Sequence, residues 1–195
     1  MQVLTGDIID STKLSNAERK GIAKTLESLA SSSKGQYDFF IRGDSFQVML
    51  EKGGLSEALR IKYLLRLKTG LSARISIGIG TVNILEERLS NSDGPAFWLS
   101  GQGLDVMKDE KTLISIHTED ELKNAEWKLH AATLDYLERT NTLNQMEVHY
   151  WLLLDNTQQE IAEEIGIRQS SVNRRIKNSG WNLIENIVSH FDHTL

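Results

Sequence analysis

Short apolar runs and alternating apolar and polar positions predict β-strands along the first 117 residues. The run at 3–9 is apolar except for Asp7, a pattern typical of a buried central strand. The run at 74–80 alternates isoleucine with serine and glycine, so its isoleucines should share one face of the sheet. The two runs around Gly43 and Asp44 predict a tight hairpin. The remaining strands are predicted at 37–41, 46–50 and 113–117.

Apolar residues at helical spacing predict three helices between these strands and an entirely helical second half. The first group is expected at 16–29, 56–67 and 94–108, and the second at 125–140, 144–154, 157–165, 169–177 and 181–191. The element order β-α-β-β-α-β-α-β, followed by helices alone, predicts an α+β domain and then an all-α domain. We expect the boundary near 118–124, with one domain over 1–120 and the other over 121–195.

Composition narrows the possible functions. The chain has 195 residues and no cysteine, which excludes disulfides, thiolate zinc sites, iron–sulfur centres and cysteine nucleophiles. The formal net charge is −5, so any contact with nucleic acid must come from a local basic patch. No apolar run approaches the roughly 20 residues that span a bilayer, and the first residues lack the features of a signal peptide. We therefore expect a cytoplasmic protein without membrane contact.

Two aspartates are placed where they could share a cation. Asp7 lies within an apolar strand, where an unpaired carboxylate would be costly, and Asp44 lies in the hairpin turn beside it. A cation such as Mg²⁺ (or Mn²⁺) prefers one or two carboxylates together with phosphate oxygens and water. We therefore predict a metal site at Asp7 and Asp44. In the alternative interpretation, Asp7 caps the following turn and Gly43-Asp44 is an ordinary hairpin turn.

The loop after the first strand and a strip of glycines are the candidate nucleotide contacts. Backbone amides just before the 16–29 helix could hold phosphates. Gly78 and Gly80 clear one strip of the sheet, where a base or ribose could lie or a helix could pack closely. The predicted nucleotide-binding residues are Ile9, Asp10, Ser11, Thr12, Gly43, Gly78 and Gly80.

The segment 157–178 has the spacing of a helix-turn-helix. A capping box at 157–160 starts the first helix, and Gly166 permits the turn. Ala162 lets the two helices cross closely, and Val172 is expected to pack beneath the second helix. The segment resembles the helix-turn-helix of sigma-factor region 4 and of related bacterial regulators.

Basic residues concentrate in the second helix of this motif. The stretch from Arg168 to Lys177 contains four basic residues and no acid, which favours contact with phosphates. Residues expected to face the bases are Gln169, Ser170, Asn173 and Arg174, and those expected near the backbone are Arg168, Arg175 and Lys177. Because one small module buries too little surface for tight binding, we expect a homodimer on DNA. The alternative is a helical hairpin used for dimerisation or packing.

Two weaker features have simpler explanations. His190 and His193 lie three residues apart and could share a metal ion, but a solvated chain end is the preferred interpretation. The tryptophans Trp127, Trp151 and Trp181 lie in helical stripes and are expected in the core or an interface.

Parts of the first domain resemble the SatD family. They are Val3-Leu4-Thr5-Gly6-Asp7-Ile8-Ile9-Asp10-Ser11, Ile41-Arg42-Gly43-Asp44-Ser45-Phe46-Gln47 and Gly94-Pro95-Ala96-Phe97. The SatD pattern is in turn similar to class III nucleotide cyclases, whose two metal-binding aspartates match Asp7 and Asp44. The resemblance implies a ferredoxin-like, nucleotide cyclase-type β-α-β-β-α-β fold, and it adds the carbonyl of Ile8 as a metal ligand.

These features together predict a DNA-binding transcriptional regulator with a sensory domain for a metal ion and a nucleoside triphosphate. The alternative is a nucleotide cyclase, or another triphosphate-processing enzyme, fused to a helix-turn-helix. A module without either activity is a third interpretation. Cyclases carry an asparagine and an arginine on the helix that matches 99–108, and that segment contains neither. The resemblance therefore favours binding over catalysis, and no catalytic residue is predicted.

Overall fold

The computed structural model describes residues 1–33, 35–39 and 44–195, and a five-stranded sheet forms in that part of the chain. The strands are β1 (Gln2–Ile8), β2 (Gln36–Phe39), β3 (Ser45–Leu50), β4 (Ala73–Ile79) and β5 (Ile114–His117). Their spatial order is β2-β3-β1-β4-β5. β1 is antiparallel to both neighbours, β2 is antiparallel to β3, and β5 is parallel to β4. Each strand lies within two residues of its predicted position.

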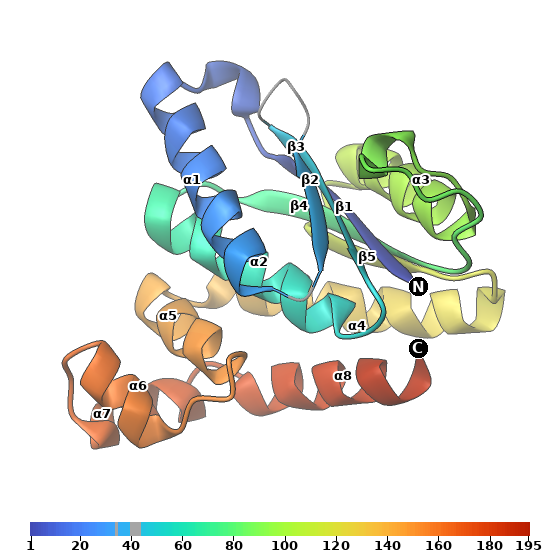
Figure 1. The fold of residues 1–195 in the computed structure, drawn as a ribbon. Coiled ribbons are helices and arrows are strands. Elements are labelled where there is room, and N and C mark those ends of the chain that lie inside the picture. The colour runs from blue at the N-terminus through green and yellow to red at the C-terminus, as the bar shows by residue number, and fades with distance from the viewer. Residues whose placement is uncertain (34, 40–43) are drawn as a thin grey trace.

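The described residues also form eight α-helices, in the predicted order. They are α1 (Asn16–Ser32), α2 (Gly54–Thr69), α3 (Pro95–Glu110), α4 (Glu121–Thr140), α5 (Leu143–Leu152), α6 (Gln158–Glu164), α7 (Gln169–Lys177) and α8 (Trp181–Thr194). The sheet has α1 and α2 on one face and α3 on the other (Figure 1). Among the described helices, none has the length and apolar character needed to cross a membrane.

The helix α2 lies at the centre of the molecule rather than on its surface. Nearly every residue from Gly54 to Leu65 is buried, including the charged residues Glu57, Arg60 and Lys62. A surface helix would instead have one polar face. The polar face is missing because α1 and the sheet contact one side of α2, while α5 and α8 cover another.

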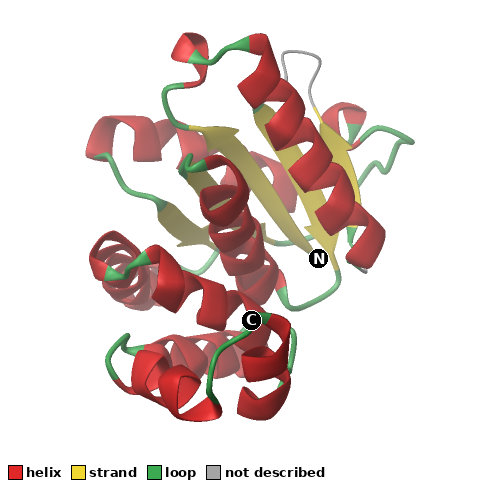
Figure 2. Cartoon of the chain, turned by 90° about the vertical axis from the view of Figure 1, so that its left-hand side faces the viewer, coloured by secondary structure: helices red, strands yellow, loops and turns green. Residues whose placement is uncertain are grey.

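One hydrophobic cluster continues from the sheet into the C-terminal helices, which gather beneath the sheet half in Figure 2. It includes Leu4 of β1 and Phe191 of α8. At the expected boundary, 118–124, the backbone amide of Thr118 donates to the side chain of Asn124 at 2.7 Å. The segment is thus an ordered turn beside a continuous core, and the division into two domains stays a prediction.

A buried ion pair joins α2 to α4. The Lys62 side chain is fully buried, and its ammonium lies 3.1 Å from the Glu138 carboxylate. The same ammonium donates to the carbonyls of Ala73 and Leu113. Burial raises the pKa of Glu138, and the neighbouring Lys62 opposes that rise. Because a buried charge needs a partner, this pair holds α4 in register with the sheet half.

Candidate functional site

Asp7 is paired with Arg74 in the structure. The two residues are opposite each other in the β1–β4 ladder, on the face of the sheet that α3 covers. Arg74 donates from Nε to Oδ1 at 2.8 Å and from Nη2 to Oδ2 at 2.9 Å. The Asp7 side chain is 15% exposed and that of Arg74 20%. A bidentate pair of this kind is a strong charge-assisted interaction, so Asp7 already has its counter-charge.

Asp44 lies beside the end of β1, as the hairpin prediction requires. Its carbonyl accepts the Ile8 amide at 2.8 Å, and its carboxylate accepts the Ser11 hydroxyl at 2.8 Å. Asp7 is opposite Ser45 in the β1–β3 ladder, one residue from Asp44. The chain segments that carry the predicted metal ligands Asp7, Ile8 and Asp44 therefore do meet.

The Arg74 guanidinium competes with any magnesium ion for the Asp7 carboxylate. Both oxygens of Asp7 accept hydrogen bonds from Arg74. An ion at the usual ~2.1 Å from those oxygens would lie against a guanidinium of the same sign of charge. The Mg²⁺ or Mn²⁺ site stays a prediction, and an ion there would share the Asp7 oxygens with Arg74.

In the loop predicted to hold phosphates, one backbone amide is already hydrogen-bonded to another part of the protein. The Ile9 amide donates to the carbonyl of Ser72 at 2.9 Å, so it is not open to a phosphate as predicted. Asp10 has a left-handed φ of 59°, and the short 3₁₀ helix that follows begins at Ser11. Thr12 is exposed. The prediction for Gly43 lies outside the described residues.

The strip at Gly78 and Gly80 is filled by α3. A Cβ atom on Gly78 would lie 2.2 Å from the Ala96 carbonyl and 2.5 Å from the Ser100 nitrogen. On Gly80 it would lie 3.0 Å from Pro95. Of the two interpretations of this strip, close helix packing is the one observed. The prediction that Gly78 and Gly80 bind a nucleotide is corrected accordingly.

The helices α5, α6 and α7 form a small cluster around Val172 of α7. Val172 is fully buried and packs with Ile161 and Ala162 of α6. The predicted capping box at 157–160 is present with both reciprocal hydrogen bonds. The turn between α6 and α7 contains Gly166 with a φ of 68°, a conformation that favours glycine. Local sequence signals were therefore enough to predict where α7 begins and ends and that its Val172 side faces inward.

The outer side of α7 carries most of the residues that were predicted to meet DNA. The exposed ones are Arg168, Gln169, Ser170, Arg174 and Lys177, and Asn173 is half-buried. The side-chain amides of Gln169 and Asn173 donate to Gln158 of α6 at 3.1 and 3.3 Å. Gln158 thereby joins the polar surface at the start of α7.

Arg175 is tied to α5 instead. Its Nη1 donates to the carbonyl of Asn144 at 3.2 Å and lies 3.4 Å from a carboxylate oxygen of Glu147. Its guanidinium thus helps to hold α7 against α5, and its expected place near a DNA backbone stays a prediction.

Comparison with models of known protein families gives one match for this chain. A model described as the SatD family matches residues 2–186, nearly the whole chain. The chain belongs to the SatD family. The match runs from β1 into α8, so the family unit includes both the sheet and the C-terminal helices.

Two solved structures of a bacterial light-regulated adenylyl cyclase are also similar to this SatD family member. Each is 16% identical and covers 59% of this chain, with TM-scores of 0.44 and 0.43. The chain matches only 42% of the length of either structure. No curated protein matches it.

The partners that complete these sites were missed by sequence reasoning on this SatD family member. Arg74 is a charged residue on a strand face that otherwise carries serine and glycine, and that exception could have pointed to Asp7. Gln158 and Glu147 gave no comparable signal, because their partners come from a different helix.

Proposed function

We propose that this SatD family protein is a DNA-binding transcriptional regulator that contacts DNA through α7. The observation that carries the proposal is the exposed basic side of this helix, formed by Arg168, Arg174 and Lys177. The segment from 168 to 177 contains no acid, in a chain whose net charge is −5. Because phosphate contacts supply most of the non-specific affinity for DNA, such a local patch suits a duplex.

The support of α7 by its neighbours favours a helix-turn-helix role. In that motif the second helix enters the major groove with its first residues toward the bases. Here Gln169, Ser170 and Asn173 lie in the first half of α7, with Gln158 beside them. Their amide and hydroxyl groups are of the kind that pair with base edges. The inner contact of Val172 and the Arg175–Glu147 pair fix the orientation of this surface.

A homodimer is part of the proposal, because two half-sites are needed for tight binding. Leu122, Leu129 and Tyr136 of α4 are 84%, 69% and 66% exposed. They are spaced seven residues apart, so they form one apolar stripe along the outer side of the helix. A second copy of α4 packed on this stripe would bury it. In such a dimer, the two α7 helices would have to lie about 34 Å apart, or a multiple of that, to reach successive major grooves.

In this proposal the sheet half is a sensory domain. A nucleoside triphosphate with Mg²⁺ or Mn²⁺ stays a prediction as its effector, and the Asp7–Arg74 pair weighs against the ion. The alternative, a cyclase or another triphosphate-processing enzyme, would need the same ion at Asp7, and the segment 99–108 contains neither the asparagine nor the arginine that the cyclase resemblance implies.

The test is fluorescence anisotropy of labelled genomic DNA fragments with the full chain at low salt. The double variant Arg174→Ala/Lys177→Ala should bind at least about tenfold more weakly, because two phosphate or base contacts are lost. The matched control Lys20→Ala/Lys24→Ala removes the same charge from the exposed side of α1 and should bind like the wild type. Equal affinity of the two double variants, or no binding by the wild type, would refute the proposal.

A further inference from the structure

The C-terminal helix α8 lies antiparallel to α4, far from α4 in sequence but beside it in space (Figure 1). At one end, Lys123 Nζ donates to the carbonyl of Thr194 at 3.1 Å. Towards the other end, the side-chain amide of Asn141 donates to the carbonyl of Ser179, just before α8, at 3.0 Å. The two helices are thus in fixed register along their length.

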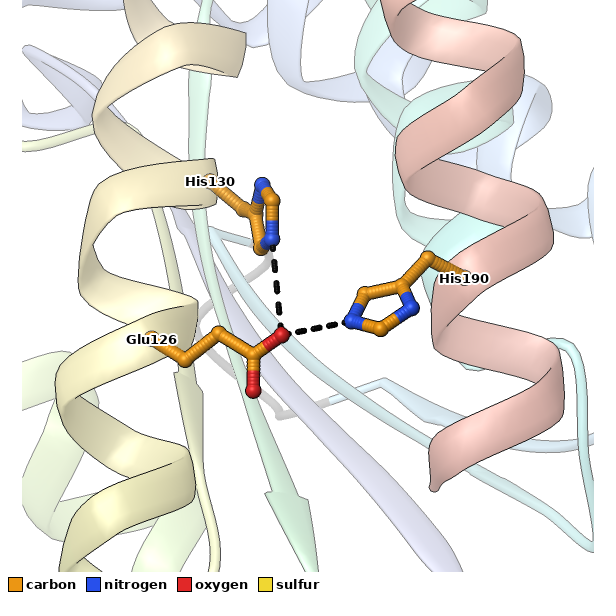
Figure 3. A group of neighbouring side chains, drawn as sticks. All are labelled: Glu126, His130 and His190. Atoms are coloured by element: carbon orange, nitrogen blue, oxygen red, sulfur yellow. Dashed lines mark hydrogen bonds and ion pairs between the residues drawn. The ribbon is translucent and has the colours of Figure 1, made fainter.

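Three metal-ligating side chains meet on this pair of helices. Glu126 and His130 are one turn apart on α4, and His190 reaches them from α8 (Figure 3). His190 Nε2 lies 2.6 Å and His130 Nε2 3.8 Å from the same oxygen of Glu126. All three ligand atoms lie within 4.8 Å of one another. The group lies close to the Lys123–Thr194 contact, so the register of the two helices brings its members together in the folded chain.

The buried ring of Trp127 packs against the imidazole rings of both His130 and His190. It is 1% exposed and therefore fixed in the core. The His190 ring stacks on it at 5.4 Å between centroids, with 25° between the planes, and the His130 ring lies at 5.0 Å. Packing against a buried aromatic ring limits the rotamers of both histidines, so less side-chain freedom would be lost when a ligand binds.

We propose that Glu126, His130 and His190 bind a divalent transition-metal ion, with Zn²⁺ as the best match to this donor set. Two imidazoles and one carboxylate are a common three-ligand set for zinc, with a fourth position left to water. Tetrahedral zinc with bonds of about 2.0–2.1 Å needs its ligand atoms roughly 3.3 Å apart. The two imidazole nitrogens, at 2.6 and 3.8 Å from the Glu126 oxygen, lie on either side of that value, so small side-chain rotations would be enough to complete the site.

The site is open enough for an ion to enter. The side chains of His130, His190 and Glu126 are 28%, 39% and 47% exposed. Imidazole nitrogens suit late first-row ions such as Zn²⁺ and Cu²⁺, whereas Mg²⁺ prefers oxygen ligands and would bind poorly. The ion therefore differs from the one predicted for Asp7 and Asp44.

Binding here would link α8 to α4 through metal bonds. Because only three residues separate α7 from α8, the ion would strengthen the attachment of α7 to the sheet half. The metal site itself rests on the cluster alone and does not depend on DNA binding.

The experiment uses the full, tag-free chain stripped of metal with EDTA. Zinc affinity is measured by competition with a chromogenic chelator, and Co²⁺ substitution reports geometry through its visible absorption bands. We expect one equivalent of Zn²⁺, tetrahedral-type Co²⁺ bands, and a zinc-dependent rise in melting temperature. His190→Ala, His130→Ala and Glu126→Gln should each weaken zinc binding at least tenfold, whereas Mg²⁺ should have no effect.

His193→Ala is the matched control, because His193 is exposed on the same helix and bonds to the carbonyl of Ser189. It should keep the zinc affinity of the wild type. Melting curves in EDTA show whether each variant is folded, and the conservative Glu126→Gln variant leaves the packing of Trp127 intact. No zinc binding at micromolar concentration would overturn the proposal, and so would binding that His190→Ala and His130→Ala leave unchanged. Equal loss in His193→Ala would also overturn it.

Discussion

His149 of α5 is expected to make the stability of this protein fall in mild acid. Its side chain is fully buried, between the rings of Tyr63 at 5.7 Å and Trp181 at 5.1 Å. Its Nε2 is 2.7 Å from the Ser179 hydroxyl. Burial lowers the pKa of His149 from 6.5 to about 4, because the charged ring would lose its hydration.

The sign and size of the effect follow from this difference. Below pH 6.5 the unfolded chain takes up a proton on His149, but the folded chain does not until about pH 4. The unfolded state therefore binds more protons in this window, and the free energy of unfolding falls as the pH falls through it. At 1.36 kcal/mol per pH unit, the full effect is about 3 kcal/mol, and about 2 kcal/mol of it should appear between pH 7 and pH 4.5.

Urea unfolding at those two pH values, for the wild type and His149→Gln, measures the effect. Burial raises the pKa values of Asp135 and Glu138, which adds stability as the pH falls, so the two proteins must be compared by difference. The acid-induced loss should be about 2 kcal/mol smaller in His149→Gln than in the wild type. Ser179→Ala is the control: it removes the hydrogen-bond partner but leaves the histidine buried, so the acid-induced loss should persist. Equal losses in the wild type and His149→Gln would refute this reasoning.

Three further outcomes test the packing and the first candidate site. Gly78→Ala should lower stability by several kcal/mol in thermal melts, because its Cβ would collide with helix backbone, whereas Gly101→Ala, with open space and a helical position, should raise it by up to about 1 kcal/mol. Lys62→Met should destabilise the fold by about 3–5 kcal/mol in urea, since Glu138 loses its buried partner; a neutral result would show that the pair does not hold α4. Millimolar Mg²⁺ should leave the melting temperature unchanged in the wild type, because a guanidinium occupies Asp7; a rise that Asp7→Asn abolishes would restore the metal prediction.

Local patterns were sufficient for most of the elements. The alternation in β4 and the nearly continuous apolar run in β1 identify central strands, and the bounds of α7 were predicted to the residue. The burial of Glu57, Arg60 and Lys62 could not be predicted, because it depends on the helices α5 and α8, which lie far along the chain from α2 and cover its outer side.

The candidate sites likewise combine features that neighbouring residues determine with contacts between residues far apart in the sequence. Capping, the turn at Gly166 and the basic face of α7 are properties of neighbouring residues, and the sequence displays them directly. The partner of Asp7 is 67 residues away, and His190 meets Glu126 across 64 residues. Pairing across such distances is decided by strand register and helix packing. A histidine near the chain end was therefore interpreted as solvated, although it stacks on a core tryptophan.

The salt dependence of DNA binding by the full chain tests the role of α7 most directly. Anisotropy titrations of one duplex at several salt concentrations give the slope of log K against log salt, which changes by about 0.9 for each phosphate contact. Because Lys177 is expected at the backbone and Arg174 at the bases, the slope of Arg174→Ala/Lys177→Ala should be shallower than that of the wild type by about 1, and Lys20→Ala/Lys24→Ala should keep the wild-type slope. The same slope in all three proteins, or no measurable binding at low salt, would contradict the assignment of α7 as the DNA-contacting helix.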